Sequence, residues 1–238
     1  MLKNLVAFEA VNSVGDALAS EGWYVDPQTN RYSCQGRTFH KTDTPWIYTN
    51  PKPGEACTVY QKIVDVAGFI PKPCLNCWKV VAKPATLYEL MELYRWQEAF
   101  AQDRLGKGHF CKCGIEVRGY VPQNYGGYFY CKSKEHGLHR WAQVRKAMDK
   151  INPDMPVTLK RYCTEFEIRL GPSDLYQRPS NADALEDAML KAIDIKSIGK
   201  PRLQPDFIKA HILKTWIQHA WDRADQTAVL FNDGDPLY

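Results

Sequence analysis

Apolar residues recur at helical spacing in several stretches of the chain. Residues 5–18 place an apolar side chain every three or four positions, and Gly22 follows where that helix would end. Thr86 and Glu89 have the spacing of a capping box, so a helix is predicted from there to about residue 105. Further helices are predicted over residues 136–150, from residue 180, and over residues 206–221.

Short β-like segments lie between these helices. Residues 23–41 contain two such runs around a Pro/Asn turn and predict a hairpin. A second hairpin is predicted over residues 111–132, with its turn at residues 122–127. Residues 58–69 and 157–170 each predict a single strand. Because helices and strands mix without a regular βαβ alternation, we expect an α+β fold with short antiparallel strands.

The 238 residues suit one large domain or two small ones. We expect an N-terminal helix and hairpin region over 1–73, a metal-binding α+β region over 74–170, and a helical region with an acidic tail over 171–238. One continuous domain could also contain all three. Residues 101–170 carry 13 basic and 7 acidic side chains, whereas residues 1–100 carry 10 of each. The positive charge is therefore concentrated in the predicted central region, where it could attract an anionic partner.

The sequence indicates a cytoplasmic protein without a membrane partner. No apolar run approaches the length of a membrane span. The first residues lack the long apolar core of a signal peptide. In a reducing compartment, the 8 cysteines are expected to be thiols or metal ligands rather than disulfides.

Five of the cysteines form the most informative pattern. Cys74 and Cys77 make a Cys-x-x-Cys pair, Cys111 and Cys113 lie two residues apart before a glycine, and Cys131 ends the second hairpin. Zinc prefers thiolate and imidazole ligands at tetrahedral corners, and such knuckles can supply them. The hairpin with its knuckle resembles a zinc ribbon in outline, over about thirty residues.

Two sets of four zinc ligands compete. The first joins the Cys-x-x-Cys pair to two of the three later cysteines and would tie together the ends of the central helix. The second is local to the hairpin and consists of Cys111, Cys113, Cys131 and His136. We favour the first set because a Cys-x-x-Cys pair is a common zinc motif.

Three alternatives to zinc stay open at these cysteines. They could be buried, unligated thiols, since cysteine is among the most buried residue types. An iron–sulfur cluster uses the same ligands. Cys74 and Cys77 could also form a redox pair, although no thioredoxin-like context surrounds them.

Cations and aromatic residues alternate along the second hairpin and the helix after it. Single-stranded nucleic acid is bound by this combination, because rings stack on bases and cations meet phosphates. The predicted nucleic-acid-binding residues are Arg118, Tyr120, Tyr125, Tyr128, Arg140, Arg145 and Lys146. The competing interpretation is cross-strand packing of the rings and a solvated helix face.

The sequence therefore predicts a zinc-stabilised binding protein that contacts nucleic acid or a nucleoprotein complex. One alternative is a metal-dependent or redox enzyme. For that alternative, Glu165 and Glu167 would share one face of the strand predicted over residues 157–170. Another is an interaction protein with a protein partner, in which zinc only stabilises the fold. The sequence does not decide whether the protein is an enzyme.

Overall fold

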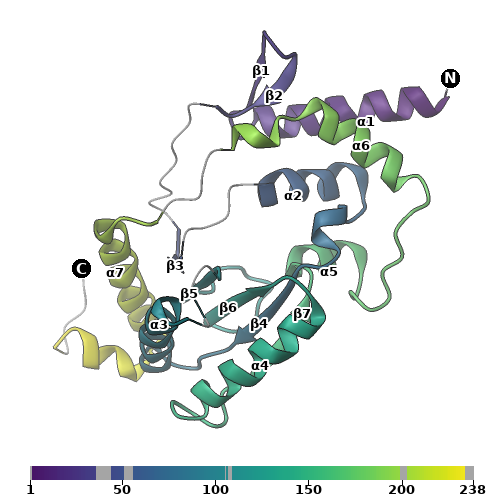
Figure 1. Cartoon of the computed structure of the whole chain (residues 1–238). Helices are drawn as coiled ribbons and strands as arrows, with labels where there is room; N and C mark the ends of the chain where they lie inside the picture. Colours follow the sequence, from purple (N-terminus) through teal and green to yellow (C-terminus); the bar gives the residue numbers. More distant parts are fainter. Residues whose placement is uncertain are drawn as a thin grey trace. The chain divides into compact units, whose positions relative to one another are not determined.

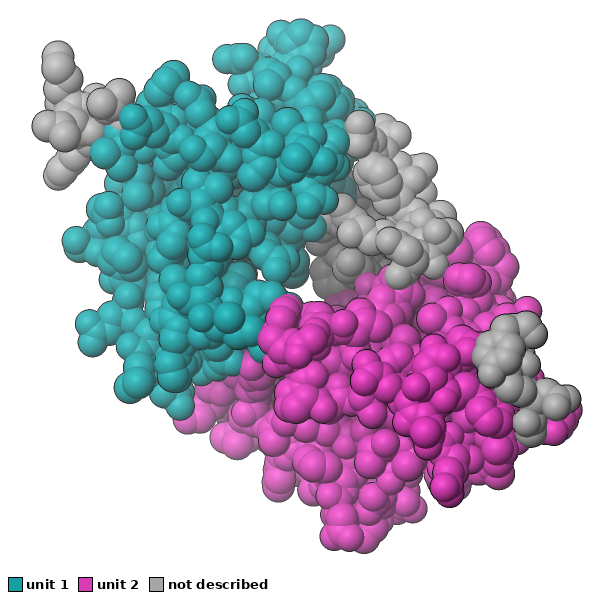
Figure 2. All heavy atoms as spheres, turned by 180° about the vertical axis from the view of Figure 1, so that it is seen from behind, with its two compact units in different colours: residues 1–39, 53–76, 162–201 teal, residues 40–52, 77–161, 202–238 magenta. Residues whose placement is uncertain are grey.

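A computed structural model describes residues 2–35, 44–50, 56–104, 106, 109–198 and 203–233, with side chains from residue 6 onward. The chain forms two compact units (Figure 2). The first unit combines residues 1–39, 53–76 and 162–201, and the second combines residues 40–52, 77–161 and 202–238. Each unit thus joins segments that are far apart in the sequence, whereas the regions predicted above are consecutive.

The first unit is mainly helical (Figure 1). Its helices are α1 (Leu2–Ala19), α2 (Ala56–Ala67), α5 (Thr164–Leu170) and α6 (Ala182–Ala192), with 3-10 turns η1 (Lys72–Cys74) and η2 (Ile195–Ser197). Strands β1 (Tyr24–Asp26) and β2 (Arg31–Ser33) form the predicted hairpin, and residues 36–41 of the predicted range lie outside the described residues. Gly22, with a φ of 87°, follows α1 and adopts a left-handed conformation that glycine tolerates best.

The core of the first unit lies between α1, α2 and α6. Val14, Val59, Ile63 and Met189 are among its buried members. The strand predicted over residues 58–69 is wrong, because this segment is α2. Its β-branched residues favour a strand locally, but Val59 and Ile63 are four residues apart and pack on one helical face.

The second unit is built on one antiparallel sheet. Its strands are β3 (Trp46–Thr49), β4 (Trp78–Ala82), β5 (Cys111–Ile115), β6 (Tyr125–Cys131) and β7 (Val157–Arg161), in the order β3-β5-β6-β4-β7. The predicted hairpin of β5 and β6 is confirmed, with Cys111 opposite Phe129 and Ile115 opposite Tyr125. Its turn was predicted too late, at 122–127, because residues 125–127 already pair with β5 and the connection spans 116–124. The α+β class is likewise confirmed.

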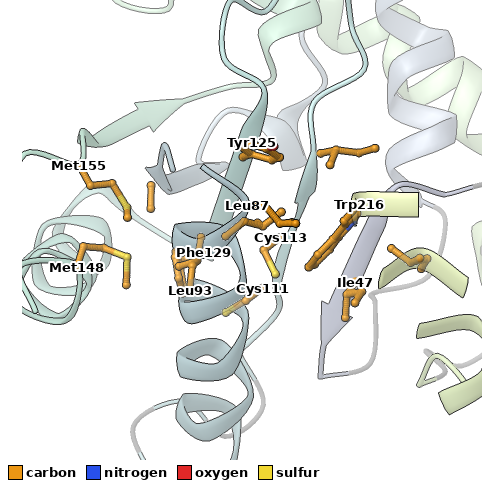
Figure 3. Packing of buried hydrophobic residues seen from close by; sticks show 14 of the residues in the cluster. Ile47, Leu87, Leu93, Cys111, Cys113, Tyr125, Phe129, Met148, Met155 and Trp216 are labelled. Carbon is orange, nitrogen blue, oxygen red and sulfur yellow. The ribbon is translucent and has the colours of Figure 1, made fainter. Parts of the chain in front are cut away.

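The described helices of the second unit pack on one face of this sheet. They are α3 (Leu87–Gln102), α4 (Lys134–Met148) and α7 (Asp206–Asp222), followed by the 3-10 turn η3 (Gln226–Phe231). Side chains from all three helices enclose the apolar side of β5 and β6, and Leu93, Phe129 and Trp216 are buried there (Figure 3). Thr86 caps α3 by accepting a hydrogen bond from the Glu89 amide, as the capping box predicts.

The strand predicted over residues 157–170 is wrong in its second half. Strand β7 ends at Arg161, Tyr162 adopts a φ of +62°, and α5 begins at Thr164. Glu165 and Glu167 therefore lie in the first turn of a helix. Residues two apart on a helix point in different directions, so the carboxylate pair expected on one strand face is not formed.

Within the described residues, none of the helices is long and apolar enough to cross a membrane.

Candidate nucleic-acid interface

Two of the predicted metal ligands lie inside the core of the second unit. Cys111 and Cys113 alternate along β5 and both point to the face that carries the helices (Figure 3). Cys113 is 0% exposed, and burial raises the pKa of its thiol well above the ordinary value. Cys111 donates a hydrogen bond from Sγ to the carbonyl oxygen of His109 at 3.8 Å. Both side chains thus behave as packed thiols in this structure.

Cys131 ends β6 on the same face of the sheet, and its Sγ donates to the Phe129 carbonyl oxygen at 3.6 Å. Burial is the main influence on both thiols and raises the pKa of Cys111 to about 12 and that of Cys131 to about 11. The nearby charge of Arg140 acts in the opposite direction but is the smaller effect. At neutral pH the two thiols are therefore protonated. Zinc binding to either would have to release a proton.

The remaining predicted ligands lie elsewhere. Cys74 ends η1 in the first unit, whereas Cys77 precedes β4 in the second. His136 lies in the first turn of α4. Among the described residues, no group of three or more His, Cys, Asp or Glu side chains is placed to hold a metal ion. The zinc and iron–sulfur assignments stay predictions.

Three of the predicted nucleic-acid-binding residues meet around Glu116, just beyond the end of β5. Arg118 donates from Nε to the buried Glu116 carboxylate at 2.6 Å, and the Tyr128 hydroxyl donates to it at 3.1 Å. The Arg118 guanidinium also lies 5.7 Å from the centre of the Tyr120 ring. Because Glu116 neutralises Arg118, this group offers little net charge to a phosphate.

The other predicted residues point away from that group. Tyr125 is 0% exposed on the opposite face of the sheet, and its hydroxyl donates to Asp225 at 2.7 Å. Arg140 is 3% exposed, with its guanidinium 4.4 Å from the centre of the Phe100 ring. Arg145 donates to Asp149 at 2.8 Å and to the Pro153 carbonyl at 3.3 Å. Lys146 is exposed near the C-terminal end of α4.

Cations and rings instead gather at the end of the sheet where β4 and β5 begin and β6 ends. We call this region the basic–aromatic end; it consists of Tyr48, Trp78, His109, Phe110, Tyr130, Lys132, Lys134 and His136. The rings of Tyr48 and Phe110 stack with centres 5.7 Å apart, and the Phe110 and Tyr130 centres are 4.9 Å apart. All three rings are partly exposed. They form a continuous row across β3, β5 and β6.

Cations lie at the same end of the sheet, although α4 packs on the face opposite to Tyr48 and Tyr130. Lys134 lies 6.0 Å from the centre of the Trp78 ring, and Lys132 is exposed directly after β6. The rings of His109 and His136 are 5.1 Å apart. Burial lowers the pKa of both imidazoles, and the charges of Arg140 and Lys132 lower it further. This end of the sheet therefore carries partly exposed rings on one face and exposed lysines nearby.

Most of this region was absent from the residues predicted above. Trp78, His109, Phe110, Lys132 and Lys134 were not among them, and of its members only His136 was named, as a metal ligand. Alternation along the strands could have placed Phe110 and Tyr130 on one face of the hairpin. No local pattern predicts that α4 brings His136 to His109, because this contact depends on the packing of the helix.

Comparisons with protein-family models, with curated proteins and with solved structures gave no match to this chain.

Proposed function

We propose that the second unit binds single-stranded nucleic acid through its basic–aromatic end. The observation that carries this proposal is the row of Tyr48, Phe110 and Tyr130 rings, with centres 5.7 and 4.9 Å apart, which ends two residues before the exposed Lys132. Unpaired bases can extend such a row by stacking on its accessible faces, which contributes about 1–3 kcal/mol per base.

The arrangement favours single strands over duplexes. Bases inside a duplex already stack on one another, so their faces cannot reach a ring on a protein surface. The rings here lie at the end of a sheet and are partly exposed, which suits bases that are free to splay apart. Lys132 is exposed two residues after Tyr130 and can neutralise a phosphate next to such bases.

Titration of the whole protein with labelled oligonucleotides tests the proposal. Single-stranded and double-stranded forms of one short sequence would be compared by fluorescence anisotropy over a series of salt concentrations. We expect saturable binding that favours the single strand, with log affinity falling by about 0.7 per phosphate contact for each tenfold rise in salt. Absence of saturable single-strand binding at protein concentrations of roughly 100 µM and low salt would overturn it and favour a protein partner.

A further inference from the structure

A cavity lies within the first unit, between α1, α6 and the hairpin of β1 and β2. Its volume is about 620 Å³, which falls within the range of small-molecule sites. The residues that line it all belong to the first unit, and we call it the hairpin cavity. The basic–aromatic end belongs to the second unit, so the two features are independent of each other.

Small apolar side chains form one part of the lining. Ala188 and Ala192 are four residues apart on α6 and therefore share one face of that helix. Val11 contributes from α1. One turn further along α1, a Cβ at Gly15 would come within 2.0 Å of the Tyr32 ring, so the hairpin packs closely on α1 beside the cavity. The short alanine side chains leave space for an apolar ligand there.

Two cations form another part of the lining. Lys191 is exposed on α6, and Arg31 begins β2. One Nη of Arg31 donates to the Ile193 carbonyl oxygen at 2.5 Å, and the other lies 4.0 Å from the Asp194 carboxylate, beyond hydrogen-bond reach. Its Nε is buried and has no hydrogen-bond partner among the described residues. The Ile193 carbonyl thus positions a guanidinium that keeps unused donors.

Two carboxylates near Arg31 limit the charge of a ligand. Asp26 lies opposite Arg31 in the hairpin, and its oxygens accept from the Gln28 amide and the Thr29 hydroxyl, each at 2.9 Å. Asp194 lies beside the guanidinium. Neither carboxylate lines the cavity, but both are close enough to act on an anion bound to Arg31. A dianion such as a phosphate monoester would be repelled more strongly than a monoanion.

We propose that the hairpin cavity binds a small monocarboxylate with an apolar body. The planar guanidinium of Arg31 suits the two oxygens of a carboxylate, and Lys191 adds a second positive charge. The apolar body would cover Ala188 and Ala192 and leave water. Aliphatic and aromatic acids share this chemistry, and the experiment below separates them.

NMR titration of the whole protein tests the inference with four probes: octanoate, 2-naphthoate, 1-octanol and octyl phosphate. We expect one of the two acids to bind with a Kd below about 1 mM and to shift the methyl signals of Val11, Ala188 and Ala192. The tighter acid shows whether the body is aliphatic or aromatic. 1-Octanol lacks the charge and should bind at least about tenfold more weakly than octanoate.

Three results of this titration would overturn the inference. The first is the absence of saturable shifts at about 10 mM of either acid, since a site of this kind should be filled at that concentration. The second is saturable shifts confined to residues outside the cavity. The third is octyl phosphate or 1-octanol binding as tightly as octanoate, because the site would then not recognise a carboxylate.

Substitutions of the two cations give a second test. Lys191→Gln should weaken binding of the acid about threefold and leave 1-octanol unaffected. Lys196→Gln is the matched control, because this exposed cation of the same unit lies outside the lining. Arg31→Gln should weaken binding at least about tenfold, with thermal unfolding as the check of its fold. Arg31→Lys keeps the charge without the planar donors and should bind less tightly than wild type.

The outcomes also separate this inference from the proposed function. Equal binding of the acid by wild type, Lys191→Gln and Arg31→Lys would overturn the carboxylate site, whatever the oligonucleotide titrations show. Single-strand binding by the second unit should be the same in all these variants.

Discussion

The Phe110 ring lies between those of Tyr48 and Tyr130, with centres 5.7 and 4.9 Å away, so that β3, β6 and the residue before β5 form one aromatic row. The contact between Phe110 and Tyr130 follows from the extension of the hairpin, because the Tyr130 amide donates to the Phe110 carbonyl at 3.2 Å. Phe110 thus belongs to the sheet although it precedes β5.

Phe110→Leu should weaken single-strand binding. Leucine keeps much of the apolar volume but removes the π-face, so we expect a loss of about 1–3 kcal/mol in binding with the salt dependence unchanged. Phe207→Leu is the matched control, because this ring is 68% exposed on α7, outside the basic–aromatic end. Fluorescence anisotropy measures both. Equal affinities of the two variants would show that the row does not stack on bases.

Charge reversal at the two ends of α4 should have different effects. Lys134 begins the helix beside Trp78, whereas Lys150 is exposed just after its last turn. At 1.5 Å per residue the two lie about 24 Å apart along the axis, well beyond the Debye length at physiological salt. Lys134→Glu should weaken binding severalfold and flatten the salt dependence, while Lys150→Glu should leave both nearly unchanged. A larger effect at Lys150 would indicate that the binding surface lies near Lys146, which is one of the nucleic-acid-binding residues predicted from the sequence.

Asp225 should make the stability of the second unit sensitive to acid. Burial raises the pKa of this carboxyl group, but hydrogen bonds from Tyr125, Thr227 and the Leu87 amide outweigh it and hold the pKa below its ordinary value. A carboxylate with a lowered pKa stabilises the folded state above its unfolded pKa, near 4, and this contribution is lost as the pH falls through the folded value.

Asp225→Asn should therefore lower the free energy of unfolding by about 2 kcal/mol at pH 7, and the difference from wild type should shrink as the pH falls below about 4. Asp222→Asn is the control, because Asp222 is exposed and accepts a hydrogen bond from Gln218 at 3.0 Å. Denaturant unfolding at several pH values measures the change. A difference that stays constant down to pH 3 would contradict the assigned role.

The zinc prediction needs a direct measurement of metal content. The sequence predicts about one zinc per chain, bound through Cys74, Cys77 and Cys113, with a fourth ligand from Cys111, Cys131 or His136. Elemental analysis of protein purified without added metal should show it, and chelation should lower the thermal midpoint. A brown protein containing iron would indicate a cluster instead. Finding no metal, with all thiols titratable in the folded protein, would leave the cysteines as core residues.

Local patterns predicted the α+β fold, the capped helix α3 and the hairpin of β5 and β6, because each depends on residues close in sequence. The strand predicted in place of α2 shows the opposite case. Its β-branched residues are typical of a strand, but the packing of Val59 and Ile63 on one side stabilises the helix. Tyr162, with a positive φ, similarly interrupts a segment that alternates like one long strand.

The binding surface was harder to predict than the fold. Tyr125 and Tyr128 are three residues apart on β6, so alternation alone places them on opposite faces, and this was visible in the sequence. The burial of Arg140 could not be predicted from the sequence, since it depends on how α4 turns towards the sheet. The contact between His109 and His136 likewise requires the packed helix.

Photo-crosslinking tests the central claim most directly. A single-stranded oligonucleotide carrying 5-iodouracil would be irradiated with the whole protein, and the modified residues would be identified by mass spectrometry. The account predicts crosslinks at Phe110, Tyr130 and Trp78, suppressed by excess unlabelled single strand and weakened by Lys134→Glu. Saturable crosslinking confined to other residues, such as Tyr120 or Tyr24, would contradict binding at the basic–aromatic end.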